Sequence, residues 1–304
     1  MINRVTHQTV QRSTLANMQM SLGKMADLQA RMSSGKVITK PSDDPAGTAK
    51  AMHLRSEKRA AEQFARNADD GRAWLSSVDT ALASSVTALR AARDLTVQGS
   101  NSGALNATAR NAIASDIEGV RDAILQQANT TYLGRSIFAG TSDAGVAFQV
   151  TPPAGPGAAP TYTWTGTPDA SVERRLSRDA TVRVDTDGSQ VYGAGAGSVF
   201  ALLDSIATDL RAGTDVGSRL TELDAHLQTM LGGLASAGTR YNQVTSAKQT
   251  ISSGVIDLRT ELSSIEDIDL AQVIVDLQMQ EVAYKGALGA TQRVLQPSLM
   301  DFLR

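Results

Sequence analysis

The chain contains no cysteine, few aromatic residues and no long apolar run. The lack of cysteine among 304 residues excludes disulfides and thiolate metal sites. Aromatic residues make up only 4% of the sequence, which favours thin helical packing over one thick core. No segment approaches the roughly 18 apolar residues of a membrane-spanning helix, so no membrane insertion is expected. The first twenty residues lack an apolar signal-peptide core, which predicts no cleaved secretory signal.

Charged residues are balanced, and groupings typical of active sites are missing. The chain has 29 basic and 31 acidic residues, which are interspersed, so nucleic acid is not an expected partner. His7, His53 and His226 are the only histidines and no two of them share a ligand spacing, which favours structural or solvated roles. No G-x-S-x-G elbow or Ser/His/Asp set occurs. The sequence therefore predicts no enzyme, with no catalytic, metal-binding or cofactor-binding residues.

Two glycine-containing motifs resemble ligand loops only in part. The stretch DTDG at 185–188 begins like a calcium loop but lacks the later ligands, so a β-turn explains it better. The stretch GAGAG at 193–197 precedes a helical run but lacks the residues of a phosphate-binding loop. We interpret it as a flexible hinge.

The order of helical and strand-like segments predicts a mainly α protein. It would be an elongated antiparallel helical bundle, or coiled-coil rod, with a small inserted β domain. We expect terminal helices at 1–44 and 268–304, forming one domain. The helical rod would comprise 45–135 and 199–267, and the β-rich insert would comprise 136–198, where proline, glycine and alternating apolar residues predict short strands and turns.

Heptad spacing gives the clearest structural signal. Between residues 220 and 265, thirteen of fourteen heptad positions are apolar, and only Lys248 interrupts, so a single long helix is predicted. A matching stripe runs from residue 75 to 89, followed by a turn at 101–103 and a shorter stripe at 113–124. The expected rod core includes Leu75, Val78, Leu82, Leu89, Leu227, Leu234, Tyr241, Val244, Ile251, Leu258 and Leu262.

The two ends of the chain form a second helical pair. Neither end has a partner nearby in sequence, and each apolar face is narrow. Burial in so small a pair barely offsets the ordering entropy. We therefore expect both ends to be mobile in the monomer and to order within an assembly. The predicted assembly or partner interface comprises Leu15, Met18, Leu22, Met25, Met32, Leu270, Ile274, Leu277, Tyr284, Leu288, Leu295, Leu299 and Phe302.

A loop separates the first terminal helix from the rod. The stretch GKVITKPSDDPAG occupies residues 35–47. Asp44 is expected to be the N-cap of the next helix, with Pro45 as its first residue. At the other end of the chain, Pro297 is expected to kink or end the last helix.

Several of these segments resemble the flagellin superfamily. Residues 28–47, LQARMSSGKVITKPSDDPAG, resemble its N-terminal signature, and residues 267–304 are similar to its C-terminal helix. Within the superfamily, the QEVAY motif at 280–284, the ending QPSLMDFL and the RSIFAG motif at 135–140 resemble the hook-associated protein 3 branch. The resemblance covers about four fifths of the chain, and the insert matches only in kind.

The resemblance implies assembly and not catalysis. Members of this branch leave the cell through the flagellar export apparatus and form the extracellular junction ring between hook and filament. The implied partners are hook-associated protein 1, flagellin, further copies of the chain, and an export chaperone on the C-terminal helix. Flagellin itself is the nearest alternative, and a cytosolic coiled-coil interaction protein is a distant one.

Overall fold

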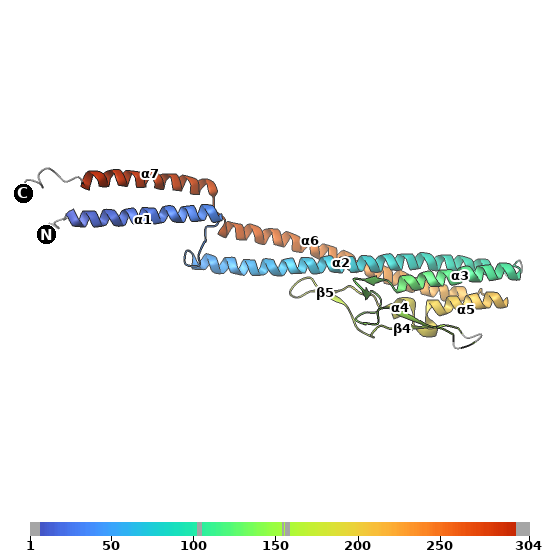
Figure 1. The fold of residues 1–304 in the computed structure, drawn as a ribbon. Helices are drawn as coiled ribbons and strands as arrows, with labels where there is room; N and C mark the ends of the chain where they lie inside the picture. The colour runs from blue at the N-terminus through green and yellow to red at the C-terminus, as the bar shows by residue number, and fades with distance from the viewer. Residues whose placement is uncertain (1–6, 102–104, 154, 156–158, 296–304) are drawn as a thin grey trace, which may run out of the picture. The chain divides into compact units, whose positions relative to one another are not determined.

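The computed structural model describes every residue except 1–6, 102–104, 154, 156–158 and 296–304. It divides the chain into two compact units, one formed by residues 1–60 with 254–304 and the other by residues 61–253. Helices dominate both units, as the sequence predicts, and Figure 1 shows them as long coiled ribbons. Residues 102 and 103 of the turn expected at 101–103 lie outside the described residues, as does the expected kink at Pro297.

Two helices from opposite ends of the chain belong to the first unit. Helix α1 spans His7–Ser34 and α7 spans Leu270–Leu295. The two lie side by side in Figure 1 and run in opposite directions, so the start of α1 and the end of α7 are on the same side of the pair. Helix α2 (Pro45–Ser100) starts as predicted, because the Asp44 carboxylate accepts a hydrogen bond from the Gly47 backbone N–H at 2.9 Å.

The predicted long helix is confirmed as α6, which spans Arg219–Glu266. Its 48 residues correspond to about 72 Å at 1.5 Å per residue. Lys248, the one polar residue in the heptad stripe, pairs with Asp69 of α2. This ion pair explains how the stripe accepts a charged residue without leaving the charge unpartnered.

In the second unit, the apolar stripe of α2 is buried together with apolar residues of helices α3 (Ala107–Ala128), α5 (Val199–Ala212) and α6. Ile117 and Ile124 of α3 belong to the same buried cluster as Leu82 of α2. In Figure 1, α3 and α5 lie alongside each other. The amphipathic stripes therefore meet in one continuous apolar core.

The predicted rod-core residues fall into two groups. Leu75, Val78, Leu82, Leu89 and Val244 are at most 1% exposed. The other six are half-buried: Leu227, Leu234, Tyr241, Ile251, Leu258 and Leu262. The half-buried group lies on α6, as does the buried Val244.

The strands are short and occur in pairs. In the described part of the chain, three two-stranded antiparallel sheets pair β1 (Thr131–Tyr132) with β2 (Arg135–Ser136), β3 (Phe148–Thr151) with β4 (Thr161–Trp164), and β5 (Glu173–Arg175) with β6 (Thr181–Arg183). The first hairpin begins before residue 136, where the insert was expected to start, because α3 ends at Ala128 and the chain then turns at Leu133 and Gly134, both with positive φ.

One expectation about the end of the insert is wrong, and a second is not tested. Asp187 caps a short helix, α4 (Gly188–Tyr192), by accepting from the Ser189 N–H at 2.8 Å, so the DTDG motif starts a helix and does not form a β-turn. The expected flexible hinge at 193–197 contains a 3₁₀ helix, η1 (Gly195–Gly197), which has no buried residue, and its flexibility stays a prediction. Gly193 adopts φ 78°, and a Cβ there would lie 2.3 Å from the Gly197 carbonyl oxygen.

Aromatic residues join the insert to the helices. Phe148, Tyr192 and Phe200 pack with ring centroids 5.1 to 5.9 Å apart. Tyr162 donates to the Asp204 carboxylate of α5 at 2.7 Å, and Arg121 of α3 pairs with the same carboxylate. Seven of the twelve aromatic residues lie between 132 and 200, which is the sequence signal that could have revealed this core.

Candidate assembly interface

The paired terminal helices bury only a narrow seam. Met18, Met25 and Leu28 of α1 are half-buried, as are Leu277 and Tyr284 of α7. No residue of either helix is fully buried among those whose burial is described. A seam of this width removes little apolar surface from water, so each helix depends on further contacts for stability.

Large apolar side chains remain exposed on the outer faces of this pair. Leu15 is 61% exposed, Met279 60% and Val282 70%. Ten of the seventeen large apolar residues found exposed lie on α1 and α7, namely Leu15, Met20, Leu22, Met32, Leu270, Ile274, Val275, Met279, Val282 and Leu288. Such a concentration is typical of a surface that another protein covers.

The predicted interface residues have different surroundings. Leu15, Leu22, Met32, Leu270, Ile274 and Leu288 are exposed, whereas Met18, Met25, Leu277 and Tyr284 lie half-buried in the seam. Leu295 ends α7, but its side chain is not described, and Leu299 and Phe302 lie outside the described residues. Sequence reasoning missed Met20, Val275, Met279 and Val282, because it followed only one apolar stripe on each helix.

Two chain segments meet where the terminal pair adjoins the ends of α2 and α6. The Val37 N–H donates to the Glu266 carbonyl at 2.6 Å, and the Ile268 N–H donates to the Gly35 carbonyl at 3.2 Å. Lys36 and Asp267 form an isolated antiparallel bridge between these two bonds. The two connecting segments therefore hold each other in register through backbone hydrogen bonds.

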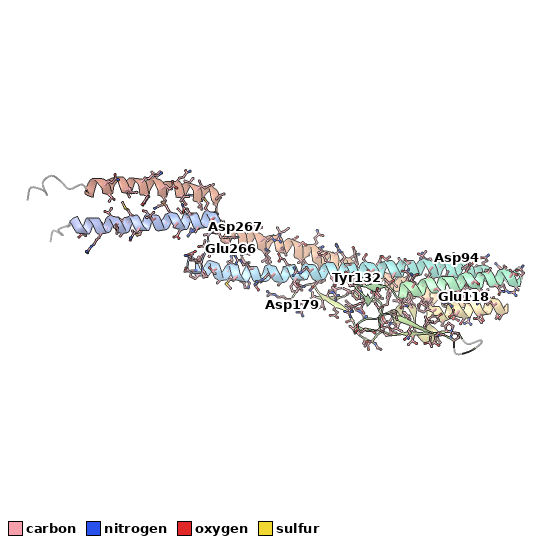
Figure 2. The ribbon with its side chains drawn as sticks, viewed as in Figure 1. Asp94, Glu118, Tyr132, Asp179, Glu266 and Asp267 are labelled. Atoms are coloured by element: carbon pink, nitrogen blue, oxygen red, sulfur yellow. The ribbon has the colours of Figure 1, made fainter. Side chains whose placement is uncertain are left out.

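Ion pairs reinforce this junction. The Glu266 side chain is 5% exposed and receives Arg55 Nη2 at 2.8 Å and Lys36 Nζ at 3.3 Å. Lys36 Nζ also donates to Asp267 Oδ1 at 2.5 Å. We call Lys36, Arg55, Glu266 and Asp267 the junction cluster; Figure 2 labels its two carboxylates. Sequence reasoning missed this cluster, since no local spacing links residues 230 positions apart.

Charge pairing changes the titration of two members of the junction cluster. The hydrogen bond to Asp267 raises the pKa of Lys36, although partial burial opposes the effect. Hydrogen bonds from Lys36 and then from Ser263 lower the pKa of Asp267. Both shifts favour the charged forms of Lys36 and Asp267.

The loop before α2 is held by its own polar side chains. Asp43 Oδ2 accepts from the Thr39 hydroxyl at 2.8 Å and from the Lys40 N–H at 2.9 Å. The hydrogen bond from Thr39 is the main cause of the lowered pKa of Asp43. The acidic pair in the SDDP motif therefore has two tasks, because Asp43 closes the loop and Asp44 starts the helix.

Nothing in the described residues points to a metal centre or a membrane span. No group of three or more His, Cys, Asp or Glu side chains is placed to hold a metal ion there. No helix in the described part of the chain is both long and apolar enough to cross a bilayer. The Asp185 carboxylate of the DTDG motif is occupied by the Val172 N–H and by Arg183.

Comparisons with known proteins point to the flagellum. Residues 5–143 match the family described as the bacterial flagellin N-terminal helical region. Flagellar hook-associated protein 3 of Salmonella typhimurium is 23% identical over 310 residues, which cover 93% of this chain and 94% of that protein. Flagellin B of Vibrio anguillarum is 30% identical, but over only 40% of this chain and 32% of that protein.

A solved structure shares the fold. The crystal structure of flagellar hook-associated protein 3 from Legionella pneumophila aligns with a TM-score of 0.62 and covers 70% of this chain and 98% of that one. Sequence identity in this alignment is 12%, so the likeness shows the fold. It confirms the mainly helical, flagellin-like class predicted from the sequence.

Proposed function

We propose that this chain, a flagellin-like protein related to flagellar hook-associated protein 3 along most of its length, is the subunit that joins the hook to the flagellin filament. It belongs to the bacterial flagellum and interacts with other flagellar components. The observation that carries the junction role is the extent of the match. Two hook-associated relatives align over 93% and 86% of this chain, whereas a flagellin aligns over 40% of it.

The mechanism would be assembly through the terminal helices. Copies of the chain would form a ring in which the exposed apolar residues of α1 and α7 pack against neighbouring subunits. Hook-associated protein 1 would contact one side of the ring and flagellin the other. These two surfaces would differ from the surface through which copies of the chain contact one another. Concentration of exposed apolar residues on α1 and α7 supports this arrangement.

The division of labour follows the three expected regions. Residues 1–44 and 268–304 would form the inner assembly domain, residues 45–135 and 199–267 the supporting rod, and residues 136–198 an outward-facing insert. Before export, a chaperone would cover the apolar face of α7, including Leu270, Ile274 and Leu288, which are exposed. The chain would then leave the cell without cleavage of a signal peptide. It would have a structural and not an enzymatic role.

The decisive experiment is deletion of the gene in its source bacterium. We expect hooks that keep hook-associated protein 1 but carry no filaments, with flagellin shed into the medium as monomer. Complementation with the wild-type gene should restore filaments. Loss of flagellin from both cells and medium would identify the chain as flagellin, and unchanged filaments in a strain without a second copy would overturn the flagellar role.

A further inference from the structure

A polar pocket of about 240 Å³ lies in the second unit, between the end of the insert and α6. Its lining includes Arg183, Gln190, Gly232, Ser236 and Arg240. The α6 residues 229, 232, 233, 236 and 240 repeat at intervals of three and four, so they share one face of the helix. None of the functions argued above uses this pocket.

Small residues on α6 create the space. A Cβ added at Gly232 would meet no atom within 4 Å, so the wall is open there. At Gly233 a Cβ would lie 2.9 Å from Val191 Cγ2, so any larger residue there would force the Val191 side chain of α4 to shift. Glycine inside a helix costs roughly 1 kcal/mol relative to alanine, and two in succession indicate a local requirement for space.

The pocket contains one guanidinium group without a carboxylate partner. Asp185 Oδ1 and Oδ2 accept from Arg183 at 2.9 and 3.1 Å, which holds that side chain in place. Arg240 Nη1 donates instead to the Asp185 backbone carbonyl at 2.8 Å. A carbonyl neutralises no charge, and Arg240 shows no carboxylate contact among the described residues.

The electrostatic surroundings of Arg240 agree with this geometry. Burial and the positive charge of Arg183 lower the pKa of Arg240, with Asp185 opposing. Asp187 also lines the pocket, and its Oδ1 accepts from the Ser189 N–H and hydroxyl at 2.8 and 2.7 Å. The Asp187 charge acts on Arg183, whereas Arg183 and Asp185 are the charges that act on Arg240. A ligand bearing one negative charge and accepting several hydrogen bonds would complete the site.

We propose that this pocket binds a carboxylate, held by Arg240 and Arg183 with Gln190 and Ser236 as further donors. A carboxylate accepts paired hydrogen bonds from guanidinium groups, which matches the two arginines better than a neutral ligand would. The group could belong to a free small carboxylate or to an acidic side chain of a second copy of the chain. In both cases the group that the two arginines bind is a carboxylate.

The test uses the full chain and follows the Arg183 and Arg240 Nε–H signals by nuclear magnetic resonance. Sodium acetate is titrated against sodium chloride at equal ionic strength. We expect saturable shifts with acetate and small, linear ones with chloride. If chloride reproduces the acetate shifts, the proposal fails, because the effect is then general screening.

Matched variants separate binding from folding. Gly232→Leu fills the open wall, keeps both arginines and should not lower stability, and we expect it to weaken acetate binding at least about tenfold. Arg240→Gln should abolish the response of the Arg183 signal, whereas Arg90→Gln, a change at an exposed arginine of α2, should leave it intact. A wild-type response from Gly232→Leu would overturn the proposal.

Dilution of the protein without acetate distinguishes the two sources of the carboxylate. In the wild type, Arg183 and Arg240 signals that shift with protein concentration would identify an acidic side chain of a second copy. In Arg240→Gln, the Arg183 signal should then no longer shift with concentration. Acetate-dependent shifts that do not change on dilution would identify a free small carboxylate. Absence of both responses would contradict the proposal.

Discussion

Arg55 and Glu266 are joined by a hydrogen bond of 2.8 Å although 211 positions separate them in sequence. The Glu266 side chain is 5% exposed and the Arg55 side chain 55%, so one partner is buried and the other reaches it from the surface. Lys36 Nζ approaches the same Glu266 oxygen at 3.3 Å. One buried carboxylate thus holds cations from both the loop after α1 and the start of α2.

Replacing Glu266 with glutamine should loosen this junction. We expect a loss of about 1–2 kcal/mol, less than for a fully buried pair, because both cations are more than a third exposed. Hydrogen exchange at the Val37 and Ile268 amides should accelerate about tenfold. Glu261→Gln, which breaks the exposed pair with Lys50 at 2.9 Å, is the matched control and should change exchange little. Equal effects of the two variants would contradict a special role for Glu266.

Acid should destabilise the second unit partly through Glu118. Arg211 donates to both Glu118 oxygens at 2.5 and 2.7 Å, and this hydrogen bonding lowers the pKa of Glu118. A carboxyl group with a lowered folded-state pKa adds stability above its unfolded pKa of about 4.3 and loses it as pH falls through the folded pKa. Urea unfolding from pH 7 down to pH 3 should show a smaller loss for Glu118→Gln than for wild type. Asp116→Asn should follow wild type; identical curves for all three would refute the linkage.

Removing the Tyr162 hydroxyl should leave the Asp204 carboxylate with one fewer partner. Asp204 is 8% exposed, and Tyr162 donates to it at 2.7 Å. We expect Tyr162→Phe to lower the free energy of unfolding by about 1–2 kcal/mol, because a buried acceptor loses a donor. Tyr241→Phe, at a half-buried tyrosine of α6, is the control and should change it by less than about 0.5 kcal/mol. Chemical unfolding followed by tryptophan fluorescence measures both.

Substitution of an exposed leucine should impair assembly, whereas substitution of a buried leucine should lower monomer stability. Leu22 of α1 is 46% exposed, whereas Leu82 of α2 is fully buried. Leu22→Gln should leave monomer stability within about 0.5 kcal/mol of wild type yet reduce filament attachment and motility. Leu82→Ala should cost roughly 2–5 kcal/mol by opening a cavity. Normal motility with Leu22→Gln would argue against α1 as an assembly surface.

The terminal helices should exchange amide hydrogens faster than the rod in the isolated monomer. Their seam contains no fully buried side chain among the residues with described burial, whereas α2 buries a complete stripe. Local opening therefore costs less free energy in α1 and α7 than in α2. Hydrogen exchange followed by mass spectrometry tests this, and binding of the ring partners should slow it. Protection of α1 equal to that of residues 75–89 in the free monomer would show that the pair orders by itself.

Much of the helical architecture can be predicted from the sequence. The heptad pattern predicts α6 to within one residue at each end, and the SDDP motif predicts both the loop and the first residue of α2. These features depend on neighbours within a few positions in the chain. Period, capping and proline geometry therefore suffice to predict them.

The candidate interface was predictable only in part. Sequence periodicity identified one apolar stripe on each terminal helix, but Met279 and Val282 lie outside that stripe and are 60% and 70% exposed. Exposure depends on which face of a helix its partner covers, which one sequence does not reveal. The assignment of these residues to assembly remains a proposal.

The sequence by itself determined the helical class, the long heptad helix and the start of α2, because these depend on interactions between residues close along the chain. Only the tertiary structure decided which distant groups meet, including Arg55 with Glu266, Tyr162 with Asp204, and the two arginines of the polar pocket. These contacts join segments separated by up to 211 positions, and no local periodicity encodes such a separation. Packing of the apolar stripes brings the segments together, and the polar contacts follow from that packing.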